Sequence, residues 1–130
     1  MSAIAVDFDG VIHAYSKGWQ DGAIYDPPLP GAFDALHFLM RQHAVFIHTA
    51  RDPRQVADWI TVKSNITTCT EPPTGPQYAA PMEFWNDQTR LLVTSRKLPA
   101  VAYIDDRGIR FADWDQTLNA LHVLGLWSPA

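Results

Sequence analysis

The sequence contains one cysteine, no run of basic residues and no long apolar segment. Because Cys69 has no second cysteine to pair with, an internal disulfide and a cysteine-rich metal cluster are excluded, and a reducing compartment is favoured. The formal net charge of −4 argues against an extended nucleic-acid-binding surface. No apolar run is long enough to span a bilayer, and the N-terminus lacks the pattern of a signal peptide. We therefore expect a cytoplasmic protein without a membrane partner.

The composition is that of a globular protein, with 47% apolar and 18% charged residues in a chain of 130. This length suits one domain, residues 1–130, with a core of useful size. No repeat, linker or low-complexity tract divides the chain.

Two strand–helix units are predicted in the first half of the chain. Apolar runs at residues 3–6 and 44–49 indicate buried parallel strands. Amphipathic spacing predicts helices over residues 30–42 and 53–63, the second with Asp52 as N-cap and Pro53 at the first helical position. The alternation predicts a Rossmann-like α/β fold, a three-layer sandwich around a central parallel sheet.

The remaining segments give weaker signals. Residues 12–27 alternate short apolar pieces with glycine turns and predict a hairpin-like flap. Residues 66–70 and 91–94 are both candidates for the third core strand, separated by a proline-rich loop at 71–81 and a short helix at 82–90. Residues 101–104 predict a further buried strand, and a helix over residues 116–124 is expected to close the domain.

Polar side chains gather at the predicted ends of these strands. Asp7 and Asp9 follow the first strand, Thr49 ends the second, and Asp105 and Asp106 end the last. Ligands of parallel α/β sheets bind at this edge. Asp7 and Asp9 are two residues apart, so their side chains start on the same side. Like charges this close repel unless a cation or a proton is shared. This edge is therefore the candidate site.

The same stretches resemble the haloacid dehalogenase superfamily of phosphohydrolases. Its first motif matches Asp7-Phe8-Asp9-Gly10-Val11, its second matches the strand ending at Thr49, its lysine matches Lys97, and its acidic pair matches Asp105-Asp106. Gly18-Trp19, Thr49-Ala50-Arg51 and the ending Ile104-Asp105-Asp106-Arg107 are similar to small members of bacterial and phage genomes that lack a cap domain. Neither interval in which the family inserts a cap is long enough to hold one here.

The resemblance implies a magnesium-dependent phosphomonoester hydrolase. Asp7 would be the nucleophile that forms an aspartyl-phosphate, and Asp9 would be the general acid and base. Mg²⁺ would be held by Asp7, Asp105 and the backbone carbonyl of Asp9, with Asp106 on a metal-bound water. Thr49 would bind the phosphoryl group and Lys97 would neutralise it. The substrate-binding set implied in this way is Gly10, Trp19, Thr49, Ala50, Arg51 and Lys97.

Several alternatives stay open from the residues alone. Arg96 competes with Lys97 as the cation of the site. Arg51 and Arg107 are equally suited to bind substrate or to pair with a neighbouring acid. His13 has no assigned role, and His48 is expected to be structural, on the face opposite Thr49.

The substrate class also stays open. It is a nucleotide, a sugar phosphate or a phosphorylated end of a macromolecule such as a nucleic acid. The rival functions are a phosphoacceptor domain and a catalytically idle binding module, and a homo-oligomer is compatible with either.

Overall fold

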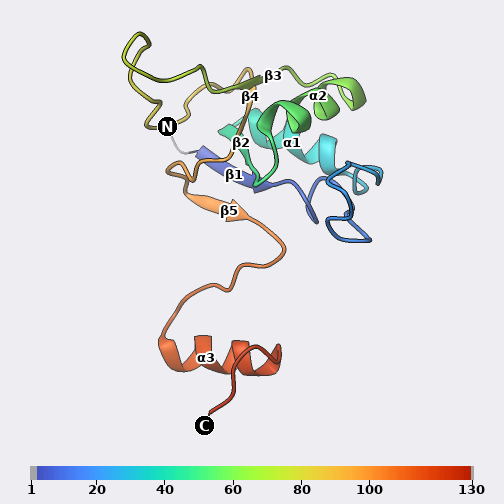
Figure 1. Cartoon of the computed structure of the whole chain (residues 1–130), viewed down its shortest axis with the longest axis vertical. Helices are drawn as coiled ribbons and strands as arrows, with labels where there is room; N and C mark the ends of the chain where they lie inside the picture. The colour runs from blue at the N-terminus through green and yellow to red at the C-terminus, as the bar shows by residue number, and fades with distance from the viewer. Residues whose placement is uncertain (1–2, 130) are drawn as a thin grey trace.

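The computed structural model describes residues 3–129 and contains a five-stranded, all-parallel sheet (Figure 1). The strands lie in the order β3-β4-β2-β1-β5. Their bounds are Ala3–Asp7 (β1), Ala44–His48 (β2), Thr68–Thr70 (β3), Leu91–Thr94 (β4) and Ala102–Ile104 (β5). The helices are α1 (Ala32–Met40), α2 (Pro53–Lys63) and α3 (Trp114–Val123). The predicted α/β class with a central parallel sheet is confirmed.

The two faces of the sheet are covered by different kinds of structure. On one face, Val6, Ile47 and Val93 pack with Leu36 of α1 and Ile60 of α2 in one apolar cluster. The opposite face packs against residues of the segment 82–100 in a second apolar cluster, formed by Ala3, Ala5, Ala44, Phe46, Trp85, Leu92 and Leu98. Burial on both faces explains why β1, β2 and β4 are continuous apolar runs in the sequence.

The two crossover helices begin at local signals. Asp52 caps α2, because its Oδ1 accepts a hydrogen bond from Arg54 N at 3.0 Å, and Pro53 occupies the first helical position as predicted. The cap of α1 is Gly31, whose φ of 80° is left-handed. The helix therefore begins at Ala32, two residues later than the predicted start at Pro30.

The third core strand is β4. It pairs with β2 and is buried along its whole length, whereas β3 pairs only with β4 and forms the edge of the sheet. The short helix predicted over residues 82–90 is wrong, because residues 81–87 have no regular structure and end in a bend at 88–90. Trp85 of this segment is instead buried against the sheet.

The predicted flap at residues 12–27 is hairpin-like only at its base, where His13 and Pro28 form an antiparallel bridge. It consists of turns with isolated bridges at His13, and Tyr15 and Gln20 have positive φ angles of 57° and 54°, which extended strands do not allow. Side chains take up the backbone groups that a ladder would pair. Tyr25 Oη accepts from Lys17 N and donates to Gly18 O, both at 2.7 Å.

The C-terminal helix forms but does not close the domain. None of the residues of α3 is buried, and Figure 1 shows the helix apart from the sheet, at the end of the segment that follows β5. The expectation that it completes the core is therefore wrong. Among residues 3–129, no helix has the length and apolar character to cross a membrane.

The core predicts a sharp contrast between two phenylalanines. Phe46 is fully buried in β2, whereas Phe38 on α1 is exposed. We expect Phe46→Ala to lower the free energy of unfolding by about 3–5 kcal/mol, because it removes buried apolar area and leaves a cavity. Phe38→Ala should change it by less than about 0.5 kcal/mol. Urea unfolding followed by circular dichroism measures both, and equal losses would contradict this packing.

Candidate active site

The carboxyl ends of three neighbouring strands form the candidate active site. Asp7 ends β1 and lies opposite His48, the last residue of β2. Val6 lies opposite Ile104, so Asp105 follows β5 beside Asp7. Because the strands are parallel, the residues that follow them share one edge of the sheet. The sequence prediction that the motifs converge there agrees with this register.

Asp7 and Asp106 form the closest acidic pair of the edge. Burial raises the pKa of Asp7 from 3.8 to about 6, the hydrogen bond from Phe8 N opposes this rise, and the carboxyls of Asp106 and Asp9 add to it. Gly10 makes room for Asp106, because a Cβ at Gly10 would overlap the Asp106 carboxyl. Its φ of 84° is also unfavourable for other residues. The absence of a side chain at Gly10 thus allows the Asp106 carboxyl to lie beside Asp7.

Asp105 is turned toward its own loop. Its Oδ1 accepts hydrogen bonds from the backbone N–H groups of Arg107, at 3.1 Å, and Gly108. A Cβ at Gly108 would lie 2.6 Å from that oxygen, so glycine is needed for this turn. The two residues of the expected acidic pair therefore have different contacts. Asp106 lies beside Asp7, whereas Asp105 accepts the hydrogen bonds that stabilise the loop after β5.

Asp9 is bound by two nitrogen donors, one on each carboxylate oxygen. His13 Nδ1 lies 2.8 Å from Oδ1, and Arg51 Nε lies 2.8 Å from Oδ2. The backbone N–H of Asp26 donates to His13 Nε2 at 3.0 Å, so Nε2 is unprotonated and Nδ1 carries the hydrogen. His13 is thus assigned as a fully buried neutral donor that orients Asp9.

Arg51 joins the acidic site to the flap. It is buried, its Nη1 donates to Gly22 O at 2.6 Å, and its guanidinium carbon lies 4.6 Å from the ring centre of Trp19. Nη2 is buried and has no hydrogen-bond partner in the described residues. Arg51 therefore pairs with the neighbouring acid, Asp9, and keeps one donor unused beside it. The exposed Trp19 covers this arginine.

Thr49 and Ala50 form the turn after β2. Thr49 is buried, its N–H donates to Thr94 O, and its Oγ1 accepts from Arg51 N at 3.1 Å. The hydroxyl thus stabilises the turn through its oxygen and retains its hydrogen for donation.

A pocket of about 420 Å³ opens beside the acidic pair. It is lined by Asp7, His48, Ala50, Tyr103, Ile104, Asp105, Arg107 and Gly108. The expectation that His48 faces away from the site is wrong, because its register opposite Asp7 places both side chains on the same face of the sheet. Side chains alternate between the two faces of the sheet along β2. Comparing His48 with Asp7, its neighbour across the strands, instead of with Thr49 would have predicted the correct face.

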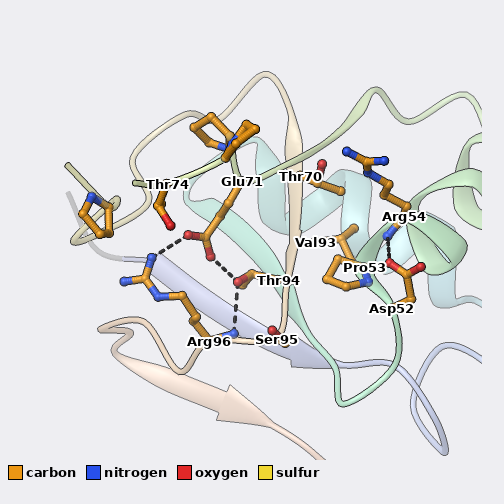
Figure 2. A pocket seen from close by; sticks show the side chains of 13 residues that line it. Asp52, Pro53, Arg54, Thr70, Glu71, Thr74, Val93, Thr94, Ser95 and Arg96 are labelled. Atoms are coloured by element: carbon orange, nitrogen blue, oxygen red, sulfur yellow. Dashed lines mark hydrogen bonds and ion pairs between the residues drawn. The ribbon is translucent and has the colours of Figure 1, made fainter. Parts of the chain in front are cut away.

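The two candidate cations lie in different places. Arg96 binds Glu71 through Nη1 and Met82 O through Nη2, at the carboxyl ends of β3 and β4. Figure 2 shows Arg96 and Thr94 both pointing at Glu71, in a second pocket of about 450 Å³. Lys97 Nζ lies 5.2 Å from the ring centre of Tyr103, which lines the pocket of Asp7. Lys97 is therefore the cation nearer to the acidic site, without an ion pair to Asp7 among the described contacts.

The donors present fit a hard divalent cation with few protein ligands. Within residues 3–129, no three His, Cys, Asp or Glu side chains form a cluster able to hold a metal. Mg²⁺ commonly uses one or two carboxylates and keeps several waters, and Asp7 with Asp106 supplies that number. Both carboxylate oxygens of Asp9 and Oδ1 of Asp105 accept hydrogen bonds from nitrogen donors. Asp105 lines the same pocket as Asp7.

Comparison of the chain with protein-family models, with curated proteins and with solved structures gives no match.

The raised pKa of Asp7 predicts a pH-dependent stability. Between pH 4 and 6 the folded state holds a proton that the unfolded chain has released, so the free energy of unfolding should fall as the pH rises through this range. Asp7→Asn removes the titrating group. In chelator-treated protein, the variant should gain about 1–2 kcal/mol relative to wild type between pH 4 and 7, less than the full shift because Asp7 is partly solvated. Urea titrations at both pH values measure this, and a difference that does not change with pH would contradict it.

Proposed function

We propose that this protein is a magnesium-dependent phosphomonoester hydrolase of the haloacid dehalogenase type, without a cap domain, that acts through Asp7. The observation that carries the proposal is the position of Asp7, at the end of β1 with Asp106 beside it and Asp9 two residues later. Two adjacent carboxylates at the carboxyl edge of a parallel sheet attract a cation, and a phosphate ester binds where a cation offsets its charge.

Asp7 would attack the phosphorus atom through a carboxylate oxygen. Its Oδ1 accepts from Phe8 N at 2.8 Å, which fixes the side chain and leaves Oδ2 for the attack. The attack forms the acyl phosphate on Asp7 and releases the alcohol, and water then cleaves the phosphorus–oxygen bond to regenerate the carboxylate. Bound Mg²⁺ would lower the repulsion between the anionic carboxylate and the phosphate.

Asp9 would protonate the leaving oxygen and later deprotonate the water. In this structure both of its oxygens accept from nitrogen donors, His13 Nδ1 and Arg51 Nε. Each oxygen keeps a second lone pair, which could hold the proton for transfer. Arg51, whose Nη2 has no hydrogen-bond partner among the described residues, would turn from Asp9 toward an incoming phosphoryl oxygen.

The phosphoryl group would bind between the turn after β2 and the acidic pair. Ala50 lines the pocket on this side, and the Thr49 hydroxyl next to it would donate its hydrogen to the phosphoryl group. Lys97, which lies over the ring of the pocket-lining Tyr103, would supply positive charge. Gly10 would act indirectly, by admitting the Asp106 carboxyl, and Trp19 by covering Arg51. The open pocket of about 420 Å³ suits a nucleotide, a sugar phosphate or a phosphorylated end of a larger molecule.

Hydrolysis of an aryl phosphate tests the proposal directly. We expect turnover by the wild type that requires Mg²⁺ and is abolished by chelator. Asp7→Asn should lower kcat by at least about a thousand-fold, because it removes the nucleophile. Asp34→Asn, on α1, is the matched control and should leave kcat unchanged. Turnover that survives in the Asp7 variant would show that the nucleophile is another residue.

Substitution of Lys97 and substitution of the neighbouring Arg96 should have different effects on activity. Lys97→Met should lower kcat/KM by about a hundred-fold, because it removes a charge that faces the transferred phosphoryl group. Arg96→Met should leave kcat/KM within a few-fold of wild type, since its guanidinium is engaged by Glu71 and Met82 O. Steady-state kinetics on one aryl phosphate measure both variants. A larger loss in the Arg96 variant would reverse the assignment.

The engagement of Asp9 also favours a second candidate function, a phosphoacceptor domain. The hydrogen bonds from His13 and Arg51 favour the ionised form of Asp9 and would weaken it as a base. If it is too weak to activate water, the acyl phosphate on Asp7 would persist. Incubation with acetyl phosphate followed by intact-protein mass spectrometry separates the two. A phosphorylated species that accumulates, with little turnover, supports the phosphoacceptor, and fast turnover supports the hydrolase. Neither phosphorylation nor turnover would leave a catalytically idle binding module.

A further inference from the structure

The last part of the chain carries exposed apolar surface that its own sheet does not cover. Most of the exposed large apolar side chains of the described residues lie between positions 101 and 127: Val101, Ile104, Ile109, Phe111, Trp114, Val123, Leu124, Leu126 and Trp127. We call residues 105–129 the C-terminal arm. Surface of this kind, contiguous in one segment, marks an interaction site in globular proteins.

Three apolar residues of α3 and its C-cap form one helical stripe. Trp114, Leu121 and Leu124 recur at intervals of seven and three, so they share a face, and Phe111 packs edge-on against Trp114 at 5.2 Å between ring centres. Trp114 is 67% exposed and Leu124 is 62% exposed. Val123, although exposed, lies on the opposite face of the helix. No residue of α3 is buried by the rest of residues 3–129, so this apolar face is left largely uncovered there.

The sheet has a matching uncovered position over β5. Ile4 and Val6 of β1 are buried under the helical layer, and their register partners in β5 are Ala102 and Ile104 on the same face. Ile104 is nevertheless 42% exposed, because the helical layer does not extend over this edge strand. Parallel sheets normally bury both faces under other elements, so this position lacks one helix.

The arm leads its helix away from this position. After β5, the Asp105 turn at Arg107 and Gly108 is followed by residues 109–111 without regular structure, and α3 begins at its cap, Asp113. Figure 1 shows the arm running clear of the sheet before α3 starts. Each chain therefore has one uncovered position over β5 and one helix with an unburied apolar stripe.

We propose that two copies of this chain exchange their C-terminal arms, so that the stripe of α3 from each copy covers the β5 face of the other. Each chain has one uncovered position on its sheet and one helix that covers nothing. In a closed two-fold dimer, the helix of each copy covers the open position of the other. The exchanged arms carry six aromatic side chains, from Phe111, Trp114 and Trp127 in two copies, together with the aliphatic residues around them. Full burial of six aromatic side chains, at about 150–250 Å² each, would cover about 900–1,500 Å², and the aliphatic residues would bring the total into the range of about 1,200–2,000 Å² typical of a stable interface.

The first experiment is the mass of the full-length protein by light scattering over a range of concentrations. We expect a dimer at micromolar concentration. Leu124→Asp should weaken dimerisation by at least a hundred-fold, because it places a charge in the buried stripe. Val123→Asp, the neighbouring residue on the opposite face, should leave the dimer intact. A wild type that is monomeric at the highest concentration, or equal effects of the two substitutions, would overturn the proposal.

A crosslink distinguishes exchange from other arrangements. In a Cys69→Ser background, chains with Ile104→Cys are mixed with chains carrying Leu124→Cys and then oxidised, with each variant oxidised alone as control. Arm exchange predicts a covalent dimer that forms in the mixture well above both controls. A double variant that instead crosslinks within one chain would show α3 folding back on its own sheet. Crosslinking of the Leu124→Cys chain alone would indicate pairing of the two helices, and either result would overturn the proposal.

Discussion

The close approach of two carboxylates at the end of β1 is the constraint on which the site depends. Asp106 reaches Asp7 only because Gly10 has no side chain. Burial is the main cause of the raised pKa of Asp7, and the carboxyl of Asp106 adds to it. A structure that served stability alone would separate these charges or give each a counter-ion. Asp7 accepts a hydrogen bond from the neutral backbone N–H of Phe8, whereas the side chains of Arg51 and His13 are bound to Asp9. The pair is therefore left for a cation or a proton, which is why this edge is the candidate for chemistry.

The turn after β1 connects this site to the flap. Phe8 O accepts backbone hydrogen bonds from Val11, Ile12 and His13, and the resulting turn brings His13 back under Asp9. His13 then accepts from the backbone of Asp26, at the far end of the flap. Arg51 reaches the middle of the flap through Gly22 O. The flap is thus organised by polar contacts that begin at Asp9, and not by pairing of its own strands.

Which features of the fold can be predicted from the sequence depends on how far apart along the chain the interacting residues lie. Buried parallel strands and the Asp52 cap depend on local patterns, so residues 3–7, 44–48 and 53–63 were found from sequence alone. The division of labour between Asp105 and Asp106 depends on two glycines, Gly10 and Gly108, one of them nearly a hundred positions away. The buried position of Trp85 depends on a space in the fold, which outweighed the helical pattern of its segment. No local signal encodes either contact.

The position of α3, apart from the sheet, also depends on contacts that no local pattern encodes. This position matters for the candidate site. The helix was predicted because its cap and periodicity are local, but its partner is a matter of tertiary or quaternary packing. The arm leaves the sheet directly after the acidic pair, through the loop that Asp105 holds. The proposed exchange of arms would therefore act next to residues 105–108, the short segment that also carries Asp105 and Asp106. A partner that fixed the arm would restrain this loop, and with it the position of Asp106 beside Asp7.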